Sequence, residues 1–197
     1  IASFPEVEKI HLIAHSRGTD VALAAVRELT IAARAAGIDP REKYKIHNFV
    51  LAAPDLDLQV ATQRIVGDKI PLSVHRTTVY TSPEDKAISI ASRFFASPRG
   101  RLGTFGQDQL TGDVKAALEY GNANFAIVNF KRAADALGSI GDRYGHSYFR
   151  NAPSVASDVL LMLRDDLDPG TPGRPLVPLG YHLWGVPPGY PDVKPPP

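Results

Sequence analysis

The stretch KIHLIAHSRGTDVALAAV, residues Lys9–Val26, joins a short apolar run to a longer segment rich in Ala, Val and Leu. The run Lys9–Ala14 is rich in Ile and Leu and ends at a polar turn, so it predicts a buried β-strand. Apolar residues recur at helical spacing over Thr19–Ala36, and Gly37 is a natural stop, so this segment predicts a helix. A single serine, Ser16, therefore lies in the turn between a strand and a helix.

The composition is that of a globular domain with little net charge. The chain has 197 residues, of which 44% are hydrophobic and 22% charged, and its formal net charge is +1. This balance gives no electrostatic reason to expect a nucleic acid or an anionic membrane as a partner. No apolar run approaches the roughly 20 residues that a transmembrane helix needs. The absence of cysteine excludes disulfides, thiolate catalysis and zinc–thiolate sites, and it fits the cytoplasm and the periplasm equally.

Strands and helices are predicted to alternate along the rest of the chain. Further buried strands are predicted at Asn48–Ala53, Arg76–Thr81 and Phe125–Phe130, helices at Lys86–Phe95 and Pro153–Leu167, and an irregular segment at Ser97–Gly112. This alternation predicts an α/β fold, a mostly parallel sheet with helices on both faces. Ligands of such sheets gather at the carboxyl ends of the strands.

The character of the sequence changes at Asp168. We expect residues 1–167 to belong to one α/β domain and residues 168–197, which are rich in Pro and Gly, to form an extended tail. The segment GYHLWG within this tail carries the one tryptophan and could dock on the domain.

The residues around Ser16 form the pattern small-x-Ser-x-Gly, AHSRG, between the predicted strand and helix. This pattern is typical of a nucleophile elbow, a tight turn that lifts the serine hydroxyl out at the top of the sheet. We expect large side chains at Ala14 and Gly18 to collide in this turn. We also expect the backbone N–H of Arg17 to face an oxyanion formed there. The alternative is a serine that only caps the helix.

A serine nucleophile needs a base, and the base needs a carboxylate that orients it. Asp85 follows a predicted strand in YTSPEDKAIS, and His146 follows the last predicted strand in YGHSYF. The order serine, acid, histidine is that of hydrolases built around a nucleophile elbow. Asp85 could instead belong to a capping box that begins at Ser82. Asp55 and Asp57, after the second predicted strand, are the reserve acids.

The other histidines fit the role of the base less well. His15 adjoins the predicted nucleophile, and we expect it to line the pocket. The remaining four lie within a strand, at strand beginnings or in the tail: His11, His47, His75 and His182. The aromatic residues that suit either an apolar substrate or the core are Phe94, Phe95, Phe105 and Tyr120.

Taken together, HLIAHSRGTDV, VYTSPEDKAIS and GHSYF resemble the α/β-hydrolase superfamily. More closely, they resemble a bacterial group of the esterase and lipase superfamily whose function is unknown. The resemblance covers roughly Lys9–Leu163 and departs from the usual pattern at Ala14, where most members have glycine. It implies a serine hydrolase with Ser16, Asp85 and His146 as its triad.

The resemblance also implies that part of the domain lies outside this sequence. In α/β hydrolases several strands precede the elbow strand, and one of their loops supplies the second oxyanion N–H. Residues 1–167 would then be the C-terminal portion of such a domain, without its N-terminal strands. The chain begins at Ile1 and its one methionine is Met162, which agrees with a longer translation product. We expect an upstream segment or another chain to pair with Lys9–Ala14 and complete the sheet.

These observations lead us to expect a carboxylic-ester hydrolase, a serine esterase or lipase-like enzyme that forms an acyl-enzyme with a small-molecule acyl substrate. We expect it to need no cofactor and no metal. Two alternatives stay open. One is an amidase or peptidase with the same triad, and the other is a non-catalytic binding module whose Pro-rich tail is a partner's ligand.

Overall fold

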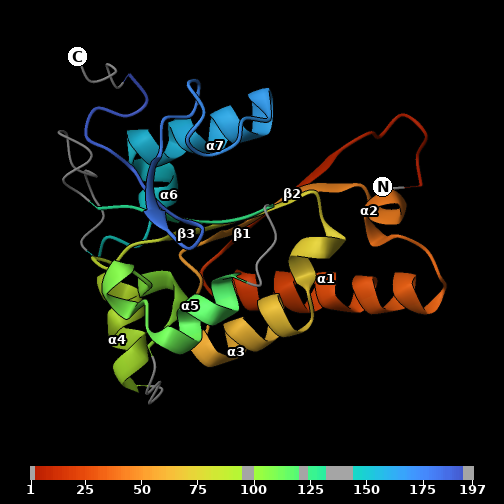
Figure 1. Cartoon of the computed structure of the whole chain (residues 1–197), viewed down its shortest axis with the longest axis horizontal. Coiled ribbons are helices and arrows are strands. Elements are labelled where there is room, and N and C mark those ends of the chain that lie inside the picture. Colours follow the sequence, from red (N-terminus) through yellow and green to blue (C-terminus); the bar gives the residue numbers. More distant parts are fainter. Residues whose placement is uncertain (1–2, 95–99, 120–123, 132–143, 193–197) are drawn as a thin grey trace.

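One sheet organises the part of the chain that the computed structural model describes, residues 3–94, 100–119, 124–131 and 144–192 (Figure 1). Its strand order is β1-β2-β3-β4-β6-β5, and every neighbouring pair is parallel except β5 and β6. The strands are β1 Ile10–His15, β2 Ile46–Ala52, β3 Arg76–Thr81, β4 Phe125–Asn129, β5 Val177–Gly180 and β6 Leu183–Gly185. The α-helices are α1 Gly18–Ala35, α2 Pro40–Tyr44, α3 Leu58–Thr62, α4 Lys86–Phe94, α5 Gly112–Glu119, α6 Tyr148–Asn151 and α7 Pro153–Asp165. Short π or 3-10 turns are η1 Gln63–Gly67, η2 Ile70–Ser73, η3 Leu102–Thr104 and η4 Gln107–Gln109.

Helices cover both faces of this sheet. Helices α1, α3, α4 and α5 lie on one face, and α6 and α7 lie on the other (Figure 1). Helices also lie in the chain between β1 and β2, between β2 and β3, and between β3 and β4. Parallel neighbours need such crossovers, because a short turn cannot return the chain to the same end of the sheet. The predicted α/β fold with a mostly parallel sheet is confirmed.

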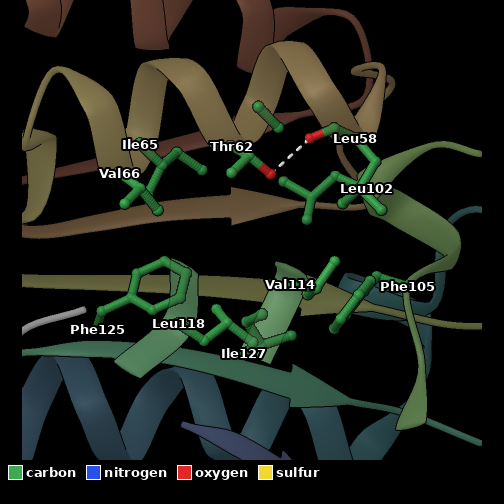
Figure 2. Close-up of a pocket in the computed structure, with 11 residues that line it drawn as sticks. Leu58, Thr62, Ile65, Val66, Leu102, Phe105, Val114, Leu118, Phe125 and Ile127 are labelled. Carbon is green, nitrogen blue, oxygen red and sulfur yellow. Dashed lines mark hydrogen bonds between the residues drawn. The ribbon is translucent and has the colours of Figure 1, made fainter. Parts of the chain in front are cut away.

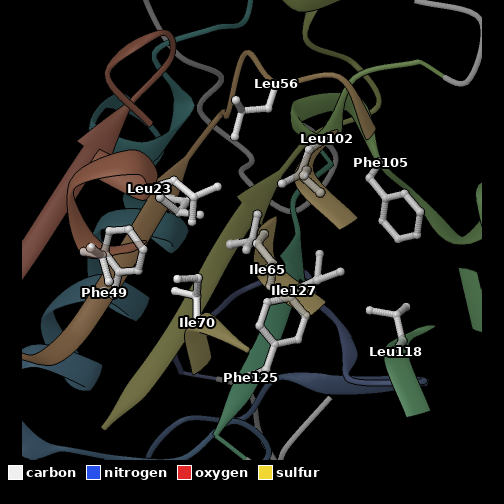
Figure 3. Close-up of a cluster of buried hydrophobic side chains, with 14 of the residues drawn as sticks. Leu23, Phe49, Leu56, Ile65, Ile70, Leu102, Phe105, Leu118, Phe125 and Ile127 are labelled. Atoms are coloured by element: carbon white, nitrogen blue, oxygen red, sulfur yellow. The ribbon is translucent and has the colours of Figure 1, made fainter. Parts of the chain in front are cut away.

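Successive residues of β2 pack into two separate cores. Phe49 and Leu51 join the core beneath α1 and α3, which Figure 3 shows, and both are fully buried. Val50 joins a second core on the opposite face, together with Tyr148 of α6 and Val155 of α7. Side chains alternate between the faces of a strand, so a strand covered on both sides must be apolar nearly throughout. This is why β2 and β4 contain the apolar runs FVLA and FAIV, whereas β3, RTTVYT, is buried with three threonines in its sequence.

The first four strands lie where the sequence predicts them. The strand Arg76–Thr81 has the predicted bounds, and the bounds of the other three differ by at most two residues. The region Ser97–Gly112 was expected to be irregular, and its described part holds the short turns η3 and η4. Helix α5, which follows directly, was not predicted.

Part of the segment after Asp168, expected to be an extended tail in which GYHLWG could dock on the domain, belongs to the sheet. Residues of this segment form the β5–β6 hairpin, and β6 pairs in parallel with β4. Leu183 of β6 is buried in the first core, which draws the hairpin onto the sheet. Pro178 lies in β5, the edge strand of this end, where a missing N–H is tolerated.

Strand β1 lies at the other edge of the described sheet and pairs with β2 alone. Its six residues, IHLIAH, include no proline and no lysine, arginine or acid, which are the usual means of protecting an edge strand. Ile13 is 49% exposed. It borders an apolar surface pocket of about 310 Å³ that Phe149 and Leu160 also line.

None of the described helices combines the length and the apolar character that crossing a membrane requires.

Candidate active site

Ser16 lies at the carboxyl end of β1, in a left-handed backbone conformation with φ of 56°. Such a φ is uncommon for a residue with a side chain, and it is typical of tight functional turns. The crowding expected at Gly18 is absent, because a Cβ built there would have no atom within 4 Å. Gly18 is exposed, on a side of the turn that no other described element covers.

The backbone of Ser16 is held by the end of the neighbouring strand. Its N–H donates to the carbonyl of Ala52 at 3.0 Å, and its own carbonyl accepts the N–H of Asp55 at 3.3 Å. The buried hydroxyl of Thr19 donates to the same carbonyl at 2.6 Å. These bonds fix the turn through the backbone N–H and carbonyl of Ser16 and do not involve its hydroxyl.

Arg17 stands at the N-cap of α1, directly after the serine. The first N–H groups of a helix have no acceptor within that helix, so they can donate to an anion bound at the turn. The Arg17 side chain is 68% exposed, and its Nη1 lies 3.9 Å from Asp55. The N–H groups of Thr19 and Asp20 in this first turn donate to the carbonyls of Ser16 and Arg17. The Arg17 N–H stays the predicted donor to an oxyanion.

The structure brings Asp85 and His146 together, although 61 positions separate them in the chain. The Oδ2 atom of Asp85 lies 2.7 Å from Nδ1 of His146, within the range expected of an orienting pair. Asp85 is completely buried and stands directly before α4, where its Oδ1 accepts the N–H of Ile88 at 3.0 Å. One carboxylate thus caps the helix and binds the histidine at the same time. The helix begins after Asp85, so a capping box starting at Ser82 is not what forms.

His146 lies against His15, the residue before the serine. The two ring centroids are 4.6 Å apart, and Nε2 of His15 lies 3.2 Å from the carbonyl oxygen of His146. The His15 ring also packs against Phe149, with the centroids 4.5 Å apart. Burial is the main reason why the pKa of His15 lies below its ordinary value, so this ring is neutral near pH 7. His15 thus links the serine turn to the histidine loop.

Tyr148 fixes the chain just after His146. It is 1% exposed, and its hydroxyl donates to the carbonyl of Tyr80 in β3 at 2.8 Å. Burial, and then the charge of Asp85, raise the pKa of Tyr148 well above 10, so the phenol keeps its proton and remains a donor. On the other side of His146, the carbonyl of Tyr144 accepts the N–H of Lys86 at 2.8 Å.

The reserve acids do not contact His146. Asp55 forms a buried ion pair with Arg101, whose guanidinium also donates to the Asp55 carbonyl at 3.2 Å. Asp57 caps α3, where its Oδ1 accepts the N–H groups of Gln59 and Val60. Asp85 is therefore the one of the three candidate carboxylates that reaches the histidine.

Sequence reasoning missed a buried polar network next to this region. Arg174 and Asp158 are fully buried and form two hydrogen bonds of 2.8 Å. The hydroxyls of Tyr80 and Tyr190 also donate to Asp158, the first at 2.6 Å. The network ties β3, α7 and the C-terminal segment together. The signal for this network in the sequence was the presence of Arg174 and Tyr190 within a segment rich in Pro and Gly.

A pocket in the first core is too small to hold an acyl chain. It has a volume of about 30 Å³, which is room for one or two waters. The pocket is lined by residues of α3, η1, η3, α5 and β4 and by Phe105, which follows η3. Figure 2 shows the labelled side chains around it. Phe105 is 1% exposed and packs in this core. The Phe94 side chain, Phe95 and Tyr120 lie outside the described residues.

A family model matches most of the chain. The model of a family described as "Alpha/beta hydrolase of unknown function (DUF900)" matches residues 1–164. No curated protein and no solved structure matches the chain.

Proposed function

Because the chain belongs to the DUF900 family of α/β hydrolases, we propose that it is a serine hydrolase that cleaves a carboxylic ester of a small-molecule acyl substrate. The observation that carries this proposal is the 2.7 Å contact between the buried Asp85 and His146. The His146 ring packs against the residue that precedes Ser16. Ser16 follows the carboxyl end of β1, Asp85 lies just beyond that of β3, and the contact with Asp85 holds His146 at the same edge, where ligands of parallel sheets bind.

The proposed reaction begins with a proton transfer. In this step Nδ1–H of His146 donates to Asp85 and Nε2 accepts the Ser16 proton. The serine oxygen attacks the acyl carbonyl, and the C–O bond to the leaving alcohol breaks as His146 returns the proton to it. Water, activated by the same histidine, then releases the acid from the acyl-enzyme. Asp85 stabilises the imidazolium in both steps.

The tetrahedral intermediates place negative charge on the former carbonyl oxygen. We propose the Arg17 N–H as one donor to this oxyanion, since it begins α1 beside Ser16. A second donor would have to come from a segment that packs beside β1. Loss of one donor costs about 10²–10³-fold in kcat, so rates should be measured on the full-length protein.

We further propose that a parallel strand, from this protein or from another chain, pairs with the free edge of β1. The support is its apolar, uncharged sequence, the exposure of Ile13 and the adjoining apolar pocket. In the full-length protein, the amide hydrogens of the paired segment and of β1 should exchange slowly in hydrogen–deuterium exchange. A structure of that protein in which β1 remains an open edge would contradict the proposal.

The ester specificity is tested with a panel of p-nitrophenyl esters of short and long acyl chains and of peptide p-nitroanilides. We expect ester hydrolysis, little anilide hydrolysis and covalent labelling of Ser16 by a fluorophosphonate probe, located by mass spectrometry of the digested protein. Faster cleavage of the anilides would favour the amidase. Neither labelling nor turnover in the folded full-length protein would favour the non-catalytic module.

A further inference from the structure

Three of the six histidines lie at the opposite end of the sheet from Ser16 and take no part in the proposed reaction. His11 and His47 lie near the beginnings of β1 and β2, and His75 directly precedes β3. Asn48 is opposite Arg76 in the β2–β3 register, so the histidines one residue earlier are neighbours. The rings of His47 and His75 stack, with centroids 4.0 Å apart and an interplanar angle of 12°.

Asp166 brings a carboxylate to this pair. It is the C-cap of α7, in a left-handed conformation with φ of 56° that ends the helix. Its two oxygens lie 2.9 and 2.8 Å from Nε2 of His47. One ligand atom each from His47, His75 and Asp166 lie within 4.8 Å of one another, and this set is the metal-compatible cluster found among the described residues.

We propose that His47, His75 and Asp166 bind a divalent transition-metal ion of the Zn²⁺ type. Two imidazoles and one carboxylate are the donor set that such ions prefer, and three protein ligands leave a fourth position for water. Ligand atoms of a tetrahedral Zn²⁺ lie roughly 3.3 Å apart, so His47 and Asp166 need to separate by about half an ångström. His75 is exposed, so its ring is free to turn toward the ion.

The charges around Asp166 decide how the ion enters. Arg76 is nearly buried, and it donates to Oδ1 of Asp166 and to Asp168, both at 2.8 Å. Lys9 donates to Oδ2 of Asp166 at 3.1 Å and is 49% exposed. The positive charges of Arg76 and Lys9 balance the negative charges of Asp166 and Asp168. The Asp166 carboxylate has lone pairs beyond those that Arg76 uses, and these can bind the ion. The exposed ammonium of Lys9 is therefore the group that the ion displaces.

Such an ion would join β2, β3 and the end of α7 at a point far from the serine. His11 forms an outer contact of the same cluster. Its ring meets that of His47 edge-on with centroids 5.8 Å apart, and its Nδ1 lies 3.0 Å from the side-chain nitrogen of Asn48. This ring contact restricts the orientation of the His47 ring.

The test is calorimetric titration of the chelator-treated full chain with ZnCl₂, supported by the visible absorption of bound Co²⁺. We expect one high-affinity ion per chain and a higher Tm when Zn²⁺ is present. His75→Ala and Asp166→Asn should each weaken binding at least tenfold, a loss of the order seen for outer-shell partners alone. Lys9→Met should strengthen binding, because it removes the competing cation.

Two histidine variants serve as controls for adventitious binding. His182→Ala, in the hairpin, and His146→Ala, at the other end of the sheet, should bind Zn²⁺ as the unaltered chain does. Circular dichroism verifies that each variant is folded, and exposed His75 is the ligand whose replacement disturbs the fold least. Absence of a high-affinity site would overturn the proposal. So would equal binding by His75→Ala and Asp166→Asn, or loss of binding in His146→Ala.

Discussion

Replacing Ser16 with alanine should lower kcat for ester hydrolysis by about 10⁶-fold, as loss of a triad serine does elsewhere, and leave the fold intact. The bonds that hold this residue run through its backbone N–H and carbonyl, to Ala52, Asp55 and Thr19. Alanine keeps those bonds and is no more strained at this φ than serine. The variant therefore removes the attacking oxygen and little else.

The measurements are kcat/KM on the best p-nitrophenyl ester, fluorophosphonate labelling and Tm, all in the full-length protein. A suitable control is Ser73→Ala at the end of η2, whose hydroxyl accepts a bond from Arg34 far from the serine turn. The control should retain activity and labelling. If Ser16→Ala keeps more than a small fraction of the turnover, Ser16 is not the nucleophile.

The Asp85→Asn exchange should lower kcat by about 10⁴-fold without a comparable loss of stability. The amide can donate to Nδ1 of His146, which favours the tautomer that cannot accept the serine proton. Asparagine caps a helix about as well as aspartate, so the bond from the Ile88 N–H should survive. The exchange thus separates the two tasks of this carboxylate.

Asp85→Ala completes the comparison. It should lose as much activity as Asp85→Asn and, in addition, about 1 kcal/mol of stability with the cap. Asp57→Asn is the matched control, because Asp57 caps α3 in the same way and does not touch the histidine. Activity of Asp85→Asn within tenfold of the unaltered protein would reduce Asp85 to a helix cap.

Much of the sheet could be predicted because its central strands are buried on both faces. Such strands need apolar residues at nearly every position, so the runs that became β2 and β4 stand out. The candidate site could be predicted for a related reason. The carboxyl ends of parallel strands meet at one edge, and the order of Ser16, Asp85 and His146 along the chain then limits the choice.

The β5–β6 hairpin and the buried ion pairs of Arg174 and Arg101 could not be predicted, because contacts between residues far apart in the chain create them. Proline and glycine in residues 168–192 indicate an extended segment, whereas contacts such as the β4–β6 pairing, the burial of Leu183 and the Arg174–Asp158 pair hold it on the sheet. Asp55 was recognised as a candidate acid, but its partner Arg101 lies 46 positions away. No local pattern records such pairings.

The left-handed backbone at Ser16 also bears on how this lineage can change over generations. A residue with a side chain costs about 1–2 kcal/mol there, whereas glycine adopts the conformation freely. If the stability of the fold were the only requirement, mutation could therefore replace Ser16 with glycine. A serine that persists among descendants is retained for its hydroxyl, and descendants that have given up the chemistry should be recognisable by a glycine at this position.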